Sequence, residues 1–443
     1  MKTYEKDLTE VPLFKGIFFY SAPLILTNLL QVLFNIADVA VVGRFAGALP
    51  LGSVGSTSQL LFFFTGLLMG LSGGINVIVA YYIGAKSKKD ISESVHTAFI
   101  ISLIAGFILM IVGFFFARPI LTLIKTKPEL LDGAVTYFSI YMLSMPGVAI
   151  YNYGNAVLGA AGDTKRPLYF LTISGVVNII LNLFFVIVCD MDCAGVALST
   201  VISQYISAIL VMIPLFIGIG DVKFSLKSFR LNGEKSRRIL KIGVPAGLQN
   251  SIFAFSNTVI QVGVNSFDAI MVAGTSASSN LDNIIYNVMG AFYTANATFI
   301  GQNYGAKKKK RILQSSIISN GYALFFGIVI SILLYIFGRQ AIGLFTTDEK
   351  VIEAGLLRLN IMVFSYPVAS FMDNTIAANR GLGKTVVPSI IVLIGSCLFR
   401  IVWVYTIFAW FKTIPSLFLL YIFSWALTAI AEIIYFIREY RKI

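Results

Sequence analysis

Long apolar stretches separated by short polar connections run along the whole chain. A bilayer core about 30 Å thick requires about 20 apolar residues in each spanning helix. Measured against that length, the pattern predicts twelve spans, at about 14–42, 52–83, 91–117, 130–160, 168–188, 194–217, 239–267, 276–304, 313–337, 351–378, 387–411 and 415–437. The longest of these exceed the required length, so we expect helices that tilt, bend or protrude. The pattern therefore predicts an all-α integral membrane protein.

Composition agrees with this assignment. Hydrophobic residues make up 57% of the chain and charged residues only 12%, whereas soluble domains average about 25% charged. The net charge of +13 comes from Lys and Arg scattered through short connections, without a folded basic domain, so we expect no nucleic-acid partner. Three cysteines are too few for a disulfide framework. We expect Cys189 and Cys193 to be unpaired, with a metal site or a disulfide there as the less favoured alternative.

The basic residues also predict orientation, because Lys and Arg accumulate in cytoplasmic connections. With both termini inside, most of the 34 Lys and Arg residues fall on the inner side, and only eight fall outside, Arg358 among them. The first fifteen residues are polar and no cleavage site follows, so we expect the first span to direct insertion. We therefore expect a multi-pass protein of a bacterial inner membrane with cytoplasmic termini.

An internal repeat divides the chain. Gly84-Ala85-Lys86 recurs as Gly305-Ala306-Lys307, an offset of 221, and Pro23 recurs as Pro245, an offset of 222. Matches at nearly one offset indicate two homologous six-helix bundles, an N-lobe over 1–220 and a C-lobe over 221–443. An even number of spans per half makes the repeats parallel, and such lobes around a central cavity suit alternating access.

Signals for enzymatic chemistry are weak. The single histidine, His96, is more often structural than catalytic, and Gly383-Lys384-Thr385 lacks the earlier glycine of a phosphate-binding loop because position 378 is alanine. We therefore expect no enzyme, no ATP and no cofactor. Transport would then draw on a gradient of H⁺ or Na⁺.

Ion coupling requires a group that binds an ion inside the membrane. A carboxylate at the centre of a spanning helix costs on the order of 2.5–3.5 kcal/mol, so each one requires a reason. Asp38 lies in an apolar run of the first span, and Asn178 and Asn182 share one face of the fifth span by their i, i+4 spacing. We interpret Asp38 as the coupling group, and a helix cap near the outer interface is the alternative.

The second half offers further polar positions within its spans. Asp282 and Asp373 could line the C-lobe cavity or belong to structural hydrogen-bond networks, and Gln302 and Asn250 are additional cavity candidates. Glu432 lies near the inner basic end of the last span, which favours an interfacial position. Arg400 must pair with an acceptor.

These residues resemble the multidrug and toxic compound extrusion (MATE) family of the MOP flippase superfamily over nearly the whole chain. The stretches that carry the resemblance are 31–38, 54–58, 70–77, 95–97, 280–283 and 298–306. The resemblance implies two six-helix bundles that export cationic, often aromatic, compounds in exchange for H⁺ or Na⁺.

The resemblance also implies roles for single residues. Asp38 and Asn178 match the cation-binding site of the N-lobe, and Tyr137 and Thr200 match its tyrosine and threonine. Pro23 matches a proline at which the first helix bends. Many relatives carry a second aspartate where this chain has Asn182, so a carboxylate pair is not available. Asp38 could titrate alone, or could coordinate Na⁺ together with Asn178.

Two other functions stay open at this point. A flippase for lipid-linked sugars or lipids would need a cavity lined by several Arg or Lys, and the spans contain few. A membrane enzyme or receptor would need a catalytic cluster or a soluble domain, and neither is visible. We expect a monomer whose partners are small-molecule substrates and membrane lipids.

Overall fold

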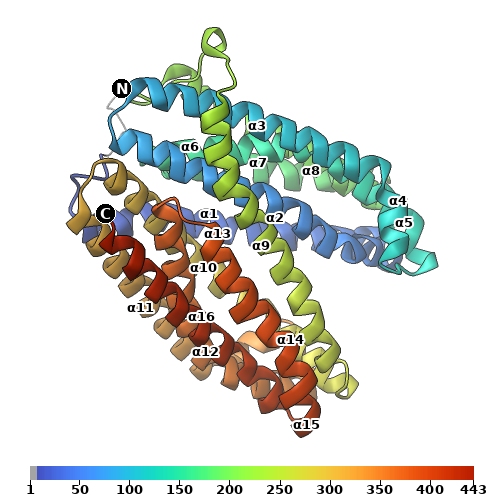
Figure 1. Ribbon diagram of the computed structural model, residues 1–443. Coiled ribbons are helices and arrows are strands. Elements are labelled where there is room, and N and C mark those ends of the chain that lie inside the picture. The colour runs from blue at the N-terminus through green and yellow to red at the C-terminus, as the bar shows by residue number, and fades with distance from the viewer. Residues whose placement is uncertain (1–6) are drawn as a thin grey trace. The chain divides into compact units, whose positions relative to one another are not determined.

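The computed structural model describes residues 7–443, apart from the side chains of residues 254 and 255. Helices account for the regular structure of these residues, and one isolated bridge joins Ile219 and Val222 (Figure 1). The prediction of an all-α protein is confirmed.

The first half of the chain contains eight α-helices and two π-helical turns. They are α1 (Leu13–Val41), η1 (Val42–Ala46), α2 (Ala48–Gly84), α3 (Lys88–Phe115), α4 (Ala117–Leu123), α5 (Pro128–Met142), α6 (Met145–Ala160), α7 (Lys165–Leu183), η2 (Phe184–Val188) and α8 (Asp192–Ile217). A linker with the short 3₁₀ helix η3 (Leu226–Ser228) follows.

The second half repeats this plan. It contains α9 (Gly233–Val264), α10 (Ala269–Gly305), α11 (Lys309–Gly343), α12 (Glu349–Gly381), α13 (Val386–Val392), η4 (Leu393–Leu398), α14 (Phe399–Trp403), η5 (Val404–Phe408), α15 (Ala409–Phe411) and α16 (Ile414–Arg441).

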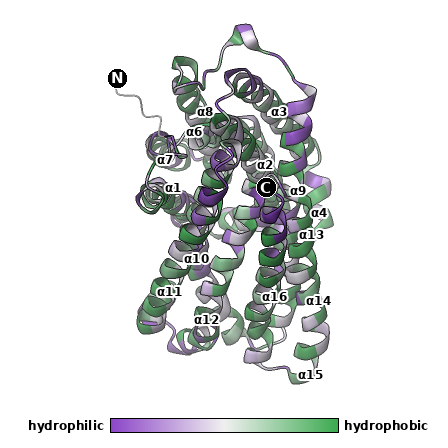
Figure 2. Cartoon of the chain, turned by 60° about the vertical axis from the view of Figure 1, so that its left-hand side comes forward, coloured by the Kyte–Doolittle hydropathy of each residue, from purple (hydrophilic) through white to green (hydrophobic). Residues whose placement is uncertain are grey.

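Within residues 7–443, nine helices are long and apolar enough to cross a membrane, or ten if α5 and α6, bent by 45°, form one broken span. Apolar residues cover most of their length (Figure 2). The helices α9 and α10 occupy the predicted spans 239–267 and 276–304 but are not among these nine. Both are rich in Ser, Thr, Asn and Gln, which lowers their hydropathy. The count of twelve spans therefore stays a prediction.

Two proline-containing helices each belong to both compact units of the chain. Unit 1 contains Leu26–Leu248 and unit 2 contains Leu8–Ile25 with Gln249–Ile443. The change of unit in α1 comes two residues after Pro23, and that in α9 comes three residues after Pro245. A proline removes one backbone hydrogen bond, so a helix can bend there. The lobes 1–220 and 221–443 stay a prediction.

Within unit 1, the first half of α9 packs on α2 through glycines. A Cβ added to Gly74 would lie 2.7 Å from the backbone N of Gly243, and one added to Gly70 would overlap the backbone of Gly247. The two glycines of α2, and likewise the two of α9, have the GxxxG spacing that lets helix backbones approach closely in membranes. Only glycine fits at this contact.

Within unit 2, the start of the chain is held by side chains of α10 and α11. The backbone N of Leu8 donates to Gln302 Oε1 at 3.1 Å, and Arg311 Nη2 donates to the carbonyl of Val11 at 2.7 Å. Buried Ile17 and Tyr20 of α1 pack in one cluster with Phe299 of α10. Hydrogen bonds and apolar packing thus attach the first half of α1 to unit 2.

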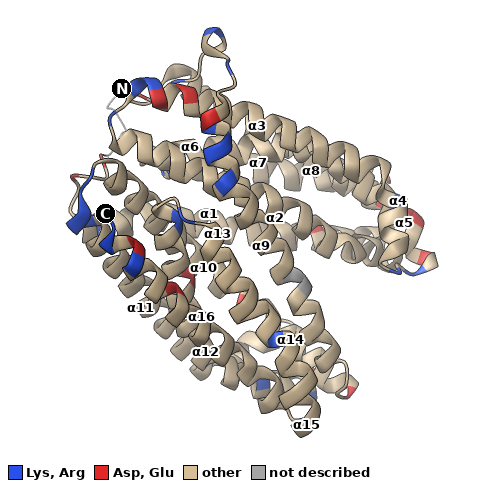
Figure 3. Ribbon diagram, viewed as in Figure 1, with Lys and Arg blue, Asp and Glu red and all other residues tan. Residues whose placement is uncertain are grey.

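Charged residues lie mainly at the ends of helices and in their connections, and the helix middles carry few (Figure 3). Charges within the apolar segments are costly. The few that occur there include the carboxylates and arginines described below.

Candidate functional site

A close approach of α1 to α7 brings the candidate residues of unit 1 together. A Cβ on Gly175 would overlap the ring of Phe34, so the ring occupies the space left by the missing side chain. Asp38 follows Phe34 by four residues, and Asn178 follows Gly175 by three. Side chains three or four positions apart share a helix face. The contact of Phe34 with Gly175 therefore puts Asp38 and Asn178 on the faces by which α1 and α7 approach each other.

Asp38 is bound by an amide of α7. Asn182 Nδ2 lies 2.5 Å from Asp38 Oδ1 and 3.3 Å from Asn178 Oδ1, and it donates to both oxygens. Asn182 and Asn178 are buried and Asp38 is half-buried. The predicted grouping of Asp38, Asn178 and Asn182 is thus present in the structure.

One buried oxygen of this cluster has no hydrogen-bond donor among the described residues, namely Asn182 Oδ1. Rotation of the amide group by half a turn would exchange the positions of its nitrogen and oxygen. The rotated amide would present three oxygens together, from Asp38, Asn178 and Asn182. The donor set therefore fits either a hydrogen-bonded carboxylate or an oxygen-coordinated cation.

Two tyrosines of α5 complete this site. The Asp38 carboxylate acts electrostatically on the hydroxyls of Tyr137 and Tyr141. Tyr137 is a predicted residue, whereas the sequence analysis missed Tyr141, which its i, i+4 spacing from Tyr137 could have indicated. Thr200 is buried on α8, and its hydroxyl donates to the carbonyl of Val196 at 3.0 Å. Thr200 thus bonds within its own helix.

The π-helical turns η1 and η2 follow directly on the segments that carry Asp38 and Asn182. Such turns occur often at functional sites. They end α1 and α7 beside a buried cluster that includes Val42, Tyr137 and Val186. The site therefore lies at the ends of these two helices against a packed apolar layer.

In unit 2, Asp282 lies in a closed ion pair. Arg358 donates to both oxygens of Asp282 and, at 2.8 Å, to Ser278 Oγ, while Tyr366 Oη donates to Asp282 Oδ1. All four groups are buried. Arg358, counted in the sequence analysis among the outer basic residues, is 2% exposed, and the carboxylate on α10 compensates its charge.

A second buried arginine lies among aromatic rings. Arg400 is 1% exposed, and its guanidinium lies 4.6 Å from the ring of Tyr421 and 5.3 Å from that of Trp425. Its Nε donates to Ser424 Oγ and its Nη1 to Asn257 Oδ1, each at 3.3 Å. The sequence analysis expected an acceptor for this buried guanidinium. In the structure it is bound by a hydroxyl oxygen, an amide oxygen and the faces of aromatic rings.

The other predicted residues of unit 2 are spread over α9, α10, α12 and α16. Asp373 is half-buried on α12, within electrostatic range of Arg380 and Arg400. Gln302 is buried and holds Leu8, and Asn250 is half-buried on α9. Glu432 of α16 is fully buried and faces α12, so its side chain points into the protein, and its position near the inner interface stays a prediction.

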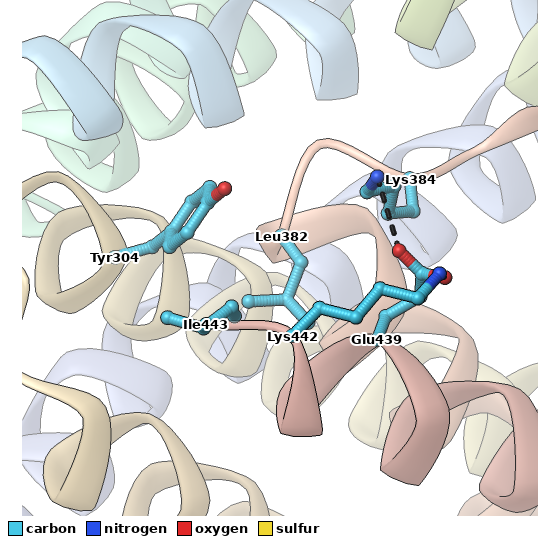
Figure 4. Close-up of a pocket in the computed structure, with 6 residues that line it drawn as sticks. All are labelled: Tyr304, Leu382, Lys384, Glu439, Lys442 and Ile443. Carbon is cyan, nitrogen blue, oxygen red and sulfur yellow. Dashed lines mark hydrogen bonds and ion pairs between the residues drawn. The ribbon is translucent and has the colours of Figure 1, made fainter.

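A pocket of about 270 Å³ lies where α10, α12 and α16 end, lined by Tyr304, Leu382, Lys384, Glu439, Lys442 and Ile443 (Figure 4). Lys384 Nζ lies 3.1 Å from Glu439 Oε2, and Lys442 pairs with the other oxygen. The hydrogen bond to Glu439 raises the pKa of the Lys384 amine. Two lysines on one carboxylate stabilise three helix ends, whose carbonyls favour cations.

The thiols of Cys189, Cys193 and Cys397 are free. Among the described residues, no group of three or more His, Cys, Asp or Glu side chains could hold a metal ion. This leaves the less favoured reading of Cys189 and Cys193 without support.

Comparisons with known proteins agree with the fold and the repeat. The MatE family model matches the chain twice, over residues 23–184 and 245–406, with starts 222 residues apart. A probable multidrug resistance protein of Bacillus subtilis, YpnP, is 30% identical over 389 residues, covering 86% of this chain and 85% of its own. A probable multidrug resistance protein of Thermotoga maritima, NorM, is 25% identical over 383 residues, covering 83% of this chain and 80% of its own.

A crystal structure of MATE in the bent conformation superposes with a TM-score of 0.90 at 20% identity, covering 98% of this chain and 97% of that one. The likeness extends over both repeats and the expected arrangement of helices. The chain is a multi-pass membrane protein and belongs to the MATE family of multidrug and toxic compound extrusion transporters.

Proposed function

We propose that this protein is a secondary antiporter that exports small cationic or amphipathic aromatic compounds in exchange for H⁺ or Na⁺. The observation that carries the proposal is the pairing of Asp38 with Asn182 inside the apolar part of unit 1. An intramembrane carboxylate with a named partner indicates a functional site. The names of the relatives in Bacillus subtilis and Thermotoga maritima support the export of several compounds.

The proposed mechanism depends on two states of Asp38, one ionised and hydrogen-bonded to Asn182, the other with an ion bound. An ionised Asp38 accepts the hydrogen bond from Asn182 Nδ2, whereas a bound ion replaces that bond. Ion uptake therefore breaks a contact between α1 and α7. An ion can drive alternating access only if it binds the two conformations with different affinity, and this contact between α1 and α7 would provide such a difference.

The proposal includes orientation and setting. The basic connections support cytoplasmic termini in the inner membrane of a bacterium. The protein would act as a monomer, with small-molecule substrates and membrane lipids as its partners and the coupling ion as its cargo.

A lipid or lipid-linked sugar flippase is less well supported. That function needs arginines or lysines that face a headgroup. The buried arginines 358 and 400 of unit 2 instead contact Asp282 and aromatic rings.

Dye export from everted vesicles tests the antiport proposal. A pH gradient and a sodium gradient are imposed separately, each with the membrane potential clamped. Export driven by either gradient supports antiport and names the ion. The proposal is contradicted if export needs neither gradient. It is also contradicted if no dye is exported when both gradients are imposed.

A further inference from the structure

A second carboxyl group, remote in sequence from Asp38, is buried in unit 2. The side chain of Glu432 is 0% exposed, on α16 facing α12. Its Oε2 accepts a hydrogen bond of 2.7 Å from Asn379 Nδ2, and the same nitrogen donates to the Glu432 backbone carbonyl at 3.2 Å. Asn379 is also fully buried.

Two oxygens of this pair have no partner among the described residues. They are Glu432 Oε1 and Asn379 Oδ1, both buried. A buried acceptor without a donor costs about 1–3 kcal/mol, and more when it is charged. The ionised form of Glu432 leaves both oxygens in that state.

Protonation supplies the missing donor. A proton on Oε1 converts that oxygen to an O–H group, and Asn379 Oδ1 is an acceptor on the amide that already donates to Oε2. A carboxylic acid and a primary amide are complementary, since the O–H can donate to the amide oxygen while an amide N–H donates to the acid's other oxygen. The neutral acid is therefore the form that this environment satisfies.

The ionised form also has a counter-charge. Arg380 lies within electrostatic range of Glu432, and its Nε is buried with no partner among the described residues. Its Nη2 donates to Gln249 Oε1 at 2.9 Å, and its guanidinium lies 5.5 Å from the ring of Tyr293. When the proton leaves, this guanidinium balances the carboxylate.

The charged group in electrostatic range of Glu432 is Arg380. Tyr293 of α10 and Tyr435 of α16 are the other titratable groups in its range, and Asp373 of α12 acts on the same Arg380. Of the other segments that pack against α16, α13, η4 and η5 contain no acidic or basic residue, whereas α14 carries Arg400, which donates to Ser424, eight residues before Glu432. The positive charge of Arg380 opposes a metal cation, so the ligand that fits is a proton.

We propose that Glu432 is a second proton-binding site, in which the acid pairs with Asn379 and the carboxylate is balanced by Arg380. On uptake, Oε1 gains a proton from water and donates it in a hydrogen bond to Asn379 Oδ1. On release, the proton returns to water and the charge stays on Glu432. The site is independent of Asp38 and does not rest on the function proposed for that residue.

The substitution Glu432→Gln separates proton binding from a structural role. Glutamine keeps one acceptor oxygen and replaces the O–H by an NH₂ group, one N–H of which can donate to Asn379 Oδ1, so it imitates the protonated acid. The control is Glu439→Gln, on the same helix, which removes a carboxylate that is paired with Lys384 and Lys442. Both proteins are purified in detergent and checked for folding by thermal unfolding.

Infrared difference spectra between acidic and alkaline samples report the C=O stretch of buried protonated carboxyls. We expect a band that titrates in the unmodified protein, in Asp38→Asn and in Glu439→Gln, and that is lost in Glu432→Gln. Difference spectra of Glu432→Gln identical to those of the unmodified protein, or no titrating band in Asp38→Asn, would overturn the assignment. So would loss of the band on adding Na⁺ at constant pH, because the ligand would then be sodium.

Discussion

Replacing Gly74 with alanine tests the contact that holds the first half of α9 on α2. The new Cβ would lie 2.7 Å from the backbone N of Gly243 and 2.8 Å from the carbonyl O of Ile239, whereas ordinary contacts begin near 3.4 Å. Both neighbours are backbone atoms, so no side chain can rotate away. The two helices must separate by roughly 0.7 Å, the difference between 3.4 and 2.7.

The expected cost follows from overpacking. Extra methyl groups in a well-packed interior destabilise by about 1–3 kcal/mol. Alanine also has a better helix propensity than glycine, by about 1 kcal/mol. The matched control Gly73→Ala carries the same propensity change, because it is the preceding residue of α2 and its Cβ would meet nothing within 4 Å.

The assay is denaturant unfolding of both variants in detergent micelles. The free energy of unfolding of Gly74→Ala is expected to be about 1–3 kcal/mol below that of Gly73→Ala. Equal stability of the two variants would refute the close contact of α2 and α9.

Two further substitutions test the contacts around the other sites. Arg358→Met leaves Asp282 buried without its counter-charge and should destabilise by about 3–5 kcal/mol; the double variant with Asp282→Asn should recover much of that loss, and an additive double variant would argue against the ion pair. Gly175→Val should displace Phe34 and lower gradient-driven dye export, with Phe34→Ala restoring part of it; export at the unmodified rate in Gly175→Val would show that this approach of α1 to α7 does not position Asp38.

The sequence predicted much of the fold because lipid imposes a simple rule. Each predicted span corresponds to a helix, a bent pair of helices or a continuous run of α- and π-helical segments, since every backbone group must be bonded within the apolar layer. The repeat could be detected because motifs such as Pro23 and Pro245 recur at nearly one offset. The resemblance implied a bend at Pro23, but the change of compact unit after each proline was not predictable, because it depends on packing between distant segments.

The candidate site was predictable only for residues whose spacing along one helix puts them on the same face. The spacing of Asn178 and Asn182 puts both amides on one face of α7, where they bond to each other and Asn182 bonds to Asp38. The pairing of Arg358 with Asp282 was not predictable, because it joins α12 to α10 across 76 residues of sequence. The pairing of Glu432 with Asn379 was not predictable for the same reason, since depth in a span does not tell which face of the helix is covered.

The most direct test of the central claim is gradient-driven dye export by proteoliposomes that contain Asp38→Asn. Its control is Asp132→Asn, which alters an exposed carboxylate of α5 that pairs with Arg118. We predict that Asp38→Asn folds and inserts normally yet loses export under both pH and sodium gradients, while Asp132→Asn exports at the unmodified rate. Full export by folded Asp38→Asn would contradict the proposal that this carboxyl couples transport to an ion.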